Sequence, residues 1–224
     1  MLALLYDIHG NLPALEAVLA DAEGAGAERY LLGGDYALFG AWPAETVDRL
    51  RELDAVWIRG NVDRWTARPD DAPDEVRPAI DACRELLEPV TVAELGALDE
   101  EAIVDGVRYC HASPRSDLDS FAPDDPAQDE ELLAGASEDR VVFGHTHIQF
   151  ARRSPLGPEL VNPGSVGIPL DGDHRGAYAL VDPDAGLDLR RVEYDWAASA
   201  VAVRDRLGDA GETAARRIEL ARFV

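Results

Sequence analysis

The stretch Leu2-Ala3-Leu4-Leu5-Tyr6-Asp7-Ile8-His9-Gly10-Asn11 decides how the rest of the chain is interpreted. Residues 2–6 form a short, uninterrupted apolar run, which is typical of a strand buried on both faces. Asp7 and His9 follow directly. A helix is predicted next, because Asn11 is a suitable N-cap and Pro13 is tolerated in a first helical turn. The stretch therefore predicts a buried strand, a polar loop and a helix, in that order.

The same order recurs further along the chain. A predicted strand at 29–32 leads into Gly33-Gly34-Asp35, and a helix is predicted from Pro43 to about residue 53. A predicted strand at 55–58 leads into Gly60-Asn61-Val62-Asp63. Such alternation indicates parallel strands with helices packed against them. It leaves open whether the strands form one doubly wound sheet or two sheets.

Two further polar clusters also follow predicted strands. A hairpin over 101–104 and 107–110, turning at Asp105-Gly106, leads to His111. A strand at 140–143 leads to Gly144-His145-Thr146-His147. Ligands of open α/β sheets bind beyond the carboxyl ends of the strands. The five clusters are therefore predicted to converge on one place.

Residues 64–98 interrupt this alternation. They are acidic, contain proline and are predicted to be mostly helical, at about 74–87 and 92–98. We expect one domain over residues 1–224, in which 64–98 form a helical insertion. The segment leaves and re-enters the fold near the converging clusters, so we expect it to act as a lid.

The converging side chains suit metal ions. Four of the five histidines lie in these clusters, mixed with carboxylate and amide groups and without a thiolate. Such a set suits Mn²⁺, Fe²⁺, Zn²⁺ or Ni²⁺. It has too many ligands for one tetrahedral ion and fits two ions about 3.5–4 Å apart. The predicted metal ligands are Asp7, His9, Asp35, Asn61, His111, His145 and His147.

Taken together, the motifs resemble those of the calcineurin-like metallophosphoesterases, in particular the small bacterial and archaeal phosphodiesterase branch. All five occur in order between about residues 2 and 182: Asp7-x-His9, Gly34-Asp35, Gly60-Asn61-x-Asp63, His111 and Gly144-His145-x-His147. The resemblance implies an α/β fold in which a two-sheet sandwich is flanked by helices. It also implies a dinuclear centre, with Mn²⁺ as the expected metal.

The resemblance further implies a role for each ligand. One ion would be bound by Asp7, His9, Asp35 and His147, and the other by Asp35, Asn61, His111 and His145. Asp35 would bridge the ions, and Asn61 would reach both a metal and a phosphoryl oxygen. Asp35, Asn61 and His111 are the predicted catalytic residues. Two metal ions lower the pKa of a shared water strongly, so that hydroxide attacks phosphorus.

Position 62 departs from many members of this family. Those members carry a histidine after the asparagine, which is thought to protonate the leaving alcohol, whereas this chain has Val62. Loss of a positioned acid typically lowers the rate about 10²–10⁴-fold.

Other polar and aromatic residues are candidates for substrate contacts or for support of the site. Arg115 and His174 are predicted substrate-binding residues, with Asn61. Among the tryptophans, Trp65 is the one most suited to contact substrate. Asp63 is expected to have a structural role beside a neighbouring arginine.

Composition limits the partners. The net charge is −23 and lysine is absent, so we expect a small phosphorylated substrate rather than nucleic acid. No apolar run approaches the roughly 20 residues that span a membrane, so no membrane partner is expected. Cys83 and Cys110 are expected to be free thiols in the cytoplasm. The oligomeric state is not indicated.

The predicted function is metal-dependent hydrolysis of phosphodiesters or phosphoanhydrides of small molecules or nucleotides. Three alternatives use the same fold: a phosphatase, a dinucleoside polyphosphate hydrolase and a non-catalytic metal-binding scaffold. A nuclease is disfavoured by the acidic charge.

Overall fold

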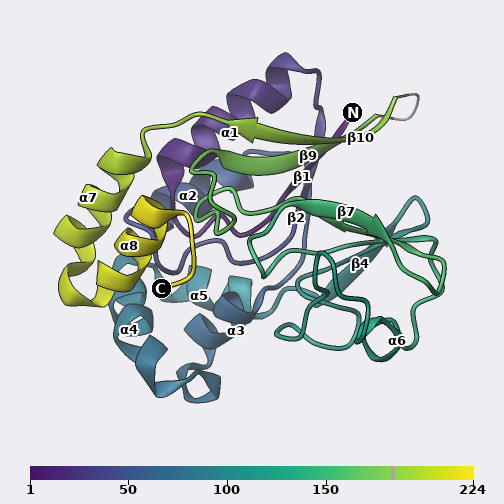
Figure 1. The fold of residues 1–224 in the computed structure, drawn as a ribbon. Coiled ribbons are helices and arrows are strands. Elements are labelled where there is room, and N and C mark those ends of the chain that lie inside the picture. The colour runs from purple at the N-terminus through teal and green to yellow at the C-terminus, as the bar shows by residue number, and fades with distance from the viewer. Residues whose placement is uncertain (183–184) are drawn as a thin grey trace.

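The computed structural model describes residues 1–182 and 185–224, whose strands form two five-stranded sheets (Figure 1). The first sheet has the order β10-β9-β1-β2-β3, and the second has the order β4-β5-β6-β8-β7. The strands are β1 (Leu2–Leu5), β2 (Arg29–Leu32), β3 (Ala55–Trp57), β4 (Glu101–Val104), β5 (Val107–Cys110), β6 (Arg140–Val142), β7 (Phe150–Arg153), β8 (Glu159–Asn162), β9 (Gly176–Asp182) and β10 (Gly186–Val192).

Strand β1 lies in the middle of the first sheet and is buried on both faces. It runs parallel to β2 and antiparallel to β9. Ala3 and Leu5 pack in the cluster that includes the helices, whereas Leu4 packs in the cluster between the sheets. Side chains alternate between the faces of a strand, so an apolar run without alternation is what this position requires.

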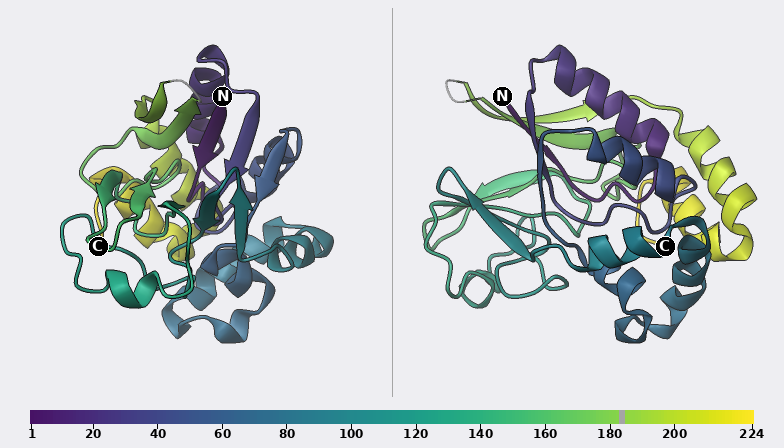
Figure 2. Two further views of the ribbon diagram at one scale, coloured as in Figure 1. Left: turned by 90° about the vertical axis from the view of Figure 1, so that its right-hand side faces the viewer. Right: turned by 180° about the vertical axis from the view of Figure 1, so that it is seen from behind.

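A separate apolar cluster lies between the two sheets. Leu4, Tyr6 and Leu31 of the first sheet pack there with Tyr109 and Val142 of the second. The expected two-sheet arrangement flanked by helices is thus confirmed, and a single doubly wound sheet is excluded. Figure 2 shows the two sheets as separate layers.

Helices cover the outer face of the first sheet and one end of the molecule (Figures 1 and 2). The helix α1 packs on β9 and β10, and α4 lies beside α2 and α7. The helices are α1 (Leu12–Gly24), α2 (Pro43–Arg51), α3 (Asn61–Ala67), α4 (Arg77–Leu86), α5 (Pro89–Gly96), α6 (Asp129–Leu132), α7 (Trp196–Leu207) and α8 (Glu212–Leu220), with 3-10 turns η1 (Pro69–Asp71), η2 (Asp74–Val76) and η3 (Gly208–Gly211). Among the described residues, no helix combines the length and the apolar character needed to cross a membrane.

The helix α3 was not expected, because Gly60-Asn61 is also a common turn dipeptide. In the structure Asn61 is the first residue of this helix. The Asp63 carboxylate accepts the backbone N–H of Gly60 at 2.9 Å, which satisfies a donor that a helix start otherwise leaves free. As a result, Asn61 is held by a helix rather than by a loop.

Candidate metal centre

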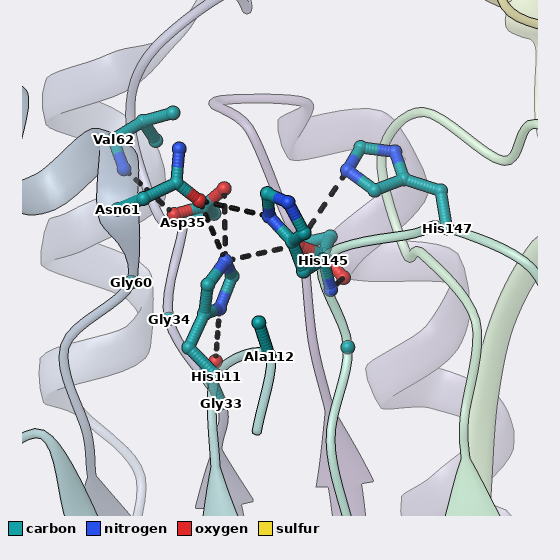
Figure 3. A network of polar contacts seen from close by, with 12 residues as sticks. Gly33, Gly34, Asp35, Gly60, Asn61, Val62, His111, Ala112, His145 and His147 are labelled. Carbon is teal, nitrogen blue, oxygen red and sulfur yellow. Dashed lines mark hydrogen bonds and ion pairs between the residues drawn. The ribbon is translucent and has the colours of Figure 1, made fainter. Parts of the chain in front are cut away.

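The seven predicted ligands come together where strands of both sheets end. Asp7, His9, Asp35 and Asn61 follow β1, β2 and β3 of the first sheet, and His111, His145 and His147 follow β5 and β6 of the second. Figure 3 shows side chains from these separate segments pointing toward one another. All of them are buried except His145, which is partly buried.

One half of the centre is built from His9, His147 and Asp7. The Nε2 atoms of the two imidazoles lie 3.1 Å apart. The Nε2 of His147 lies 3.5 Å from Asp7 Oδ1, and the Nε2 of His9 lies 3.8 Å from Asp35 Oδ2. Asp7, His9 and His147 form one of the two groups found among the described residues whose ligand atoms lie close enough to hold a metal ion.

The other half is built around His111. Its Nε2 lies 2.9 Å from Asn61 Oδ1 and 3.4 Å from Asp35 Oδ2. The Nδ1 of His145 lies 3.0 Å from the same Asn61 oxygen. Asp35 therefore reaches both halves, as predicted for a bridge. Asp7 reaches both halves as well, because its Oδ1 lies 3.9 Å from His111 Nε2. This second shared carboxylate was not expected.

Backbone carbonyls fix three of the imidazole rings. The Nδ1 of His9 lies 3.0 Å from Leu38 O, and that of His111 lies 2.9 Å from Gly33 O. The Nδ1 of His147 is anchored in the same way on the carbonyl of Ile168. A ring whose Nδ1–H donates to a carbonyl can offer the lone pair of its Nε2 to an ion at the centre, which is the usual support of a metal-binding histidine.

The donor atoms fit a cation. Asp7 Oδ1 is fully buried and has no hydrogen-bond partner among the described residues. Burial raises the pKa of Asp7 well above its usual value, although His111 opposes that shift. Two lone pairs also face each other across the 3.1 Å between His9 and His147. Buried charges and lone pairs in this arrangement require a compensating positive charge.

Electrostatics within the centre are dominated by Asp35 and His111. Burial would lower the pKa of His111, but the charges of Asp35 and Asp7 outweigh it and raise the pKa to about 10. Burial would likewise raise the pKa of Asp35, but His111 holds it below its usual value. The centre therefore favours an ionised Asp35 carboxylate, the form that binds a metal ion.

The loops that carry the ligands are strained. Asp7 (φ 53°), His9 (φ 50°), Asp35 (φ 61°), His145 (φ 67°) and His147 (φ 59°) all adopt left-handed backbone conformations. Non-glycine residues rarely do so, and such strain gathers at functional sites. Left-handed turns thus direct Asp7 and His9, and likewise His145 and His147, toward the centre.

Two features hold the loop that carries Asp35 against the start of α3. A Cβ atom on Gly60 would lie 2.0 Å from Asp35 Oδ1, so only glycine permits this approach. The carboxylate of Asp63 accepts backbone N–H groups from Asp35 at 2.8 Å and Tyr36 at 3.1 Å. Asp63 is therefore structural, as predicted, but its partners are backbone amides and not a neighbouring arginine.

A cavity of about 760 Å³ opens over the centre. Its wall includes His9, Asp35, Asn61, His145 and His147. The 64–98 segment contributes Trp65, Glu75 and Val76, and the C-terminal part contributes Arg217 and Phe223. A volume of this size suits a substrate as large as a nucleotide. That the 64–98 segment moves as a lid stays a prediction.

The structure places the two other predicted substrate contacts outside this cavity. His174 stacks on Trp196 with 4.4 Å between ring centroids, and its Nε2 lies 2.9 Å from Glu219 O. Arg115 is exposed and lines a separate hollow of about 230 Å³ behind His111. Neither side chain lines the cavity over the centre, and a role of Arg115 or His174 in substrate binding stays a prediction. Sequence position near a motif did not reveal which way these loops turn.

Residues 1–186 match the model of the calcineurin-like phosphoesterase superfamily domain. The chain is 30% identical over 219 residues to an uncharacterized protein of Methanocaldococcus jannaschii, with 87% of this chain and 88% of that protein covered.

Two solved structures share the whole fold. A metallophosphoesterase from Sphaerobacter thermophilus is 26% identical, with a TM-score of 0.84 and 98% of each chain covered. A hypothetical protein from Pyrococcus horikoshii is 20% identical, with a TM-score of 0.83, and 100% of this chain and 98% of that chain are covered. The family uses divalent metal ions, and the geometry described above supplies groups that can hold them. On this evidence the chain belongs to the calcineurin-like phosphoesterase superfamily and is a hydrolase.

Proposed function

We propose that this protein hydrolyses phosphodiester or phosphoanhydride bonds of small phosphorylated molecules, including nucleotides, with two divalent metal ions. One observation carries the proposal. Asp35 Oδ2 lies 3.8 Å from His9 Nε2 and 3.4 Å from His111 Nε2, between two groups of converging donor atoms. A carboxylate placed in this way suits a pair of ions better than a single one.

The protein's own groups would position the substrate. When bound, the ions supply positive charge to the phosphoryl oxygens and lower the pKa of water. Asn61 directs its Oδ1 toward His111 and His145, so its amide nitrogen points away from them (Figure 3). That N–H₂ group has no acceptor among the described residues and faces the cavity, where it can donate to a phosphoryl oxygen. The charge on the phosphoryl oxygens strengthens such a hydrogen bond.

Val62 decides the preferred leaving group. It lines the cavity beside Asn61, and its backbone N–H donates to Asp35 Oδ1 at 3.1 Å. Its side chain cannot give a proton to a departing oxygen. We therefore propose a preference for substrates with acidic leaving groups, such as aryl diesters and phosphoanhydrides.

Charge and donor chemistry support the choice of partner and metal. A net charge of −23 disfavours approach to a nucleic-acid backbone, so we propose small substrates. Imidazole nitrogens together with carboxylate and amide oxygens suit Mn²⁺, which we propose as the preferred ion, with Fe²⁺, Zn²⁺ and Ni²⁺ as alternatives.

The test is a screen of metal-loaded protein against phosphomonoesters, phosphodiesters and nucleotides. We expect two ions per chain and turnover of bis(p-nitrophenyl) phosphate, with slower turnover of alkyl monoesters. Protein stripped with a chelator is the control. A chain that binds two ions but turns over no phosphate compound would show a metal-binding scaffold and overturn the proposal.

A further inference from the structure

Among the described residues, one cation lines the cavity in addition to the predicted metal ligands. Arg217, near the end of α8, is partly buried there, and α8 lies beyond the residues that match the family model. Its Nε is buried without an acceptor, and none of its nitrogens forms a hydrogen bond or ion pair within the described residues. A partly buried guanidinium without an acceptor is costly, and most of the described arginines pair with a carboxylate.

The carboxylates nearest along the helix are already occupied. Glu212 and Glu219 of α8 both pair with Arg204 of α7, at 2.8 Å and 2.5 Å. Burial lowers the pKa of Arg217, and no carboxylate charge offsets that effect. Arg217 lines the same cavity as His9 and Asp35. Its free donors therefore face a space in which an anion would be stabilised.

A turn and an aromatic ring hold this side chain in place. The backbone reverses at Ala221, which adopts a left-handed conformation with φ 47°. Its carbonyl accepts the backbone N–H of Gly172 at 2.7 Å. Phe223 is thereby brought over Arg217, with the guanidinium carbon 4.2 Å from the ring centroid. Stacking on a ring fixes the plane of a guanidinium and leaves its edge free to donate.

We propose that Arg217 binds a phosphate oxygen of the substrate. The proposal rests on the proposed function and specifies how its substrate is bound. Arg217 is a substrate-binding residue that acts from outside the metal-binding motifs. The apolar side chains of Val62, Leu118 and Phe39 complete the wall, where they suit the organic part of a phosphate ester.

The experiment compares Arg217→Gln with Arg216→Gln. The two changes remove the same charge from adjacent positions of α8, but Arg216 is exposed and does not line the cavity. The probe is inorganic phosphate, titrated calorimetrically into Mn²⁺-loaded protein. A hydrogen bond between charged groups predicts about 10- to 100-fold weaker phosphate binding for Arg217→Gln. Arg217→Lys keeps the charge and should restore part of the affinity.

The same variants are assayed with bis(p-nitrophenyl) phosphate. Arg217→Gln should raise KM while the number of bound ions stays that of the wild type. Equal phosphate affinity and equal KM in Arg217→Gln and Arg216→Gln would overturn the inference. If the wild type turns over no phosphate ester, the proposed function fails, and the calorimetric comparison still decides whether Arg217 binds phosphate.

Discussion

Replacing Gly60 by alanine would place a methyl group where the Asp35 carboxylate now lies. The added Cβ would be 2.0 Å from Asp35 Oδ1 and 2.6 Å from the Asp35 backbone nitrogen. Since such contacts are not found below 3.0 Å, the carboxylate oxygen must retreat by about 1 Å. That movement also breaks the 3.1 Å hydrogen bond from the Val62 N–H. The shared carboxylate would thus be displaced while every donor atom of the centre is retained.

The expected effect is large on function and moderate on stability. A misplacement of about 1 Å at a reacting centre costs about 10²-fold in rate. Forced repacking costs about 1–3 kcal/mol of unfolding free energy. The assays are kcat/KM for bis(p-nitrophenyl) phosphate, bound metal per chain and urea denaturation of the metal-free protein. Gly24→Ala is the matched control, since its Cβ meets no atom within 4 Å and should not lower stability. Wild-type turnover and metal content in Gly60→Ala would refute the reasoning.

Three further predictions concern the ions and the leaving group. Asp35→Asn should lose both ions, because the Asp35 carboxylate of the wild type reaches both halves of the centre, whereas His9→Ala should mainly affect one ion. Two ions per chain in Asp35→Asn, counted by mass spectrometry, would contradict a bridging role of Asp35. Val62→His should flatten the dependence of kcat/KM on leaving-group pKa across aryl and alkyl diesters, and a flat series in the wild type would mean that another group supplies the proton. Removal of the ions by EDTA should abolish turnover and lower Tm, because each ion at 100 times its Kd stabilises the folded state by about 2.7 kcal/mol. An unchanged Tm would show that bound ions do not compensate the buried carboxylate of Asp7.

The sequence allowed the centre to be predicted better than its surroundings. Each of the seven converging side chains follows a strand, and that position can be seen in a single sequence. The two sheets could not be told from one by alternation, because the decisive pairing of β1 with β9 joins segments at opposite ends of the chain. Here the family resemblance supplied the arrangement, which the structure confirmed.

Residues that act through tertiary contacts could not be identified in this way. His174 and Arg115 were predicted to bind substrate because they stand close to motifs, and sequence could not show that neither lines the cavity over the centre. Arg217 gave no signal, because an arginine on an amphipathic helix looks like any other solvated charge. Only the cavity and the lack of a partner distinguish it.

The division of the centre between two sheets has a consequence for how the chain folds. His9 and His147 are 138 residues apart in sequence, and their ring nitrogens meet only when both sheets are packed together. Closing such a long loop costs conformational entropy, so contacts between residues this far apart form late in folding. The apolar side chains between the sheets must therefore assemble first, against the mutual repulsion of Asp7 and Asp35. An ion that binds afterwards ties the halves together, so its release should accelerate unfolding much more than it slows refolding.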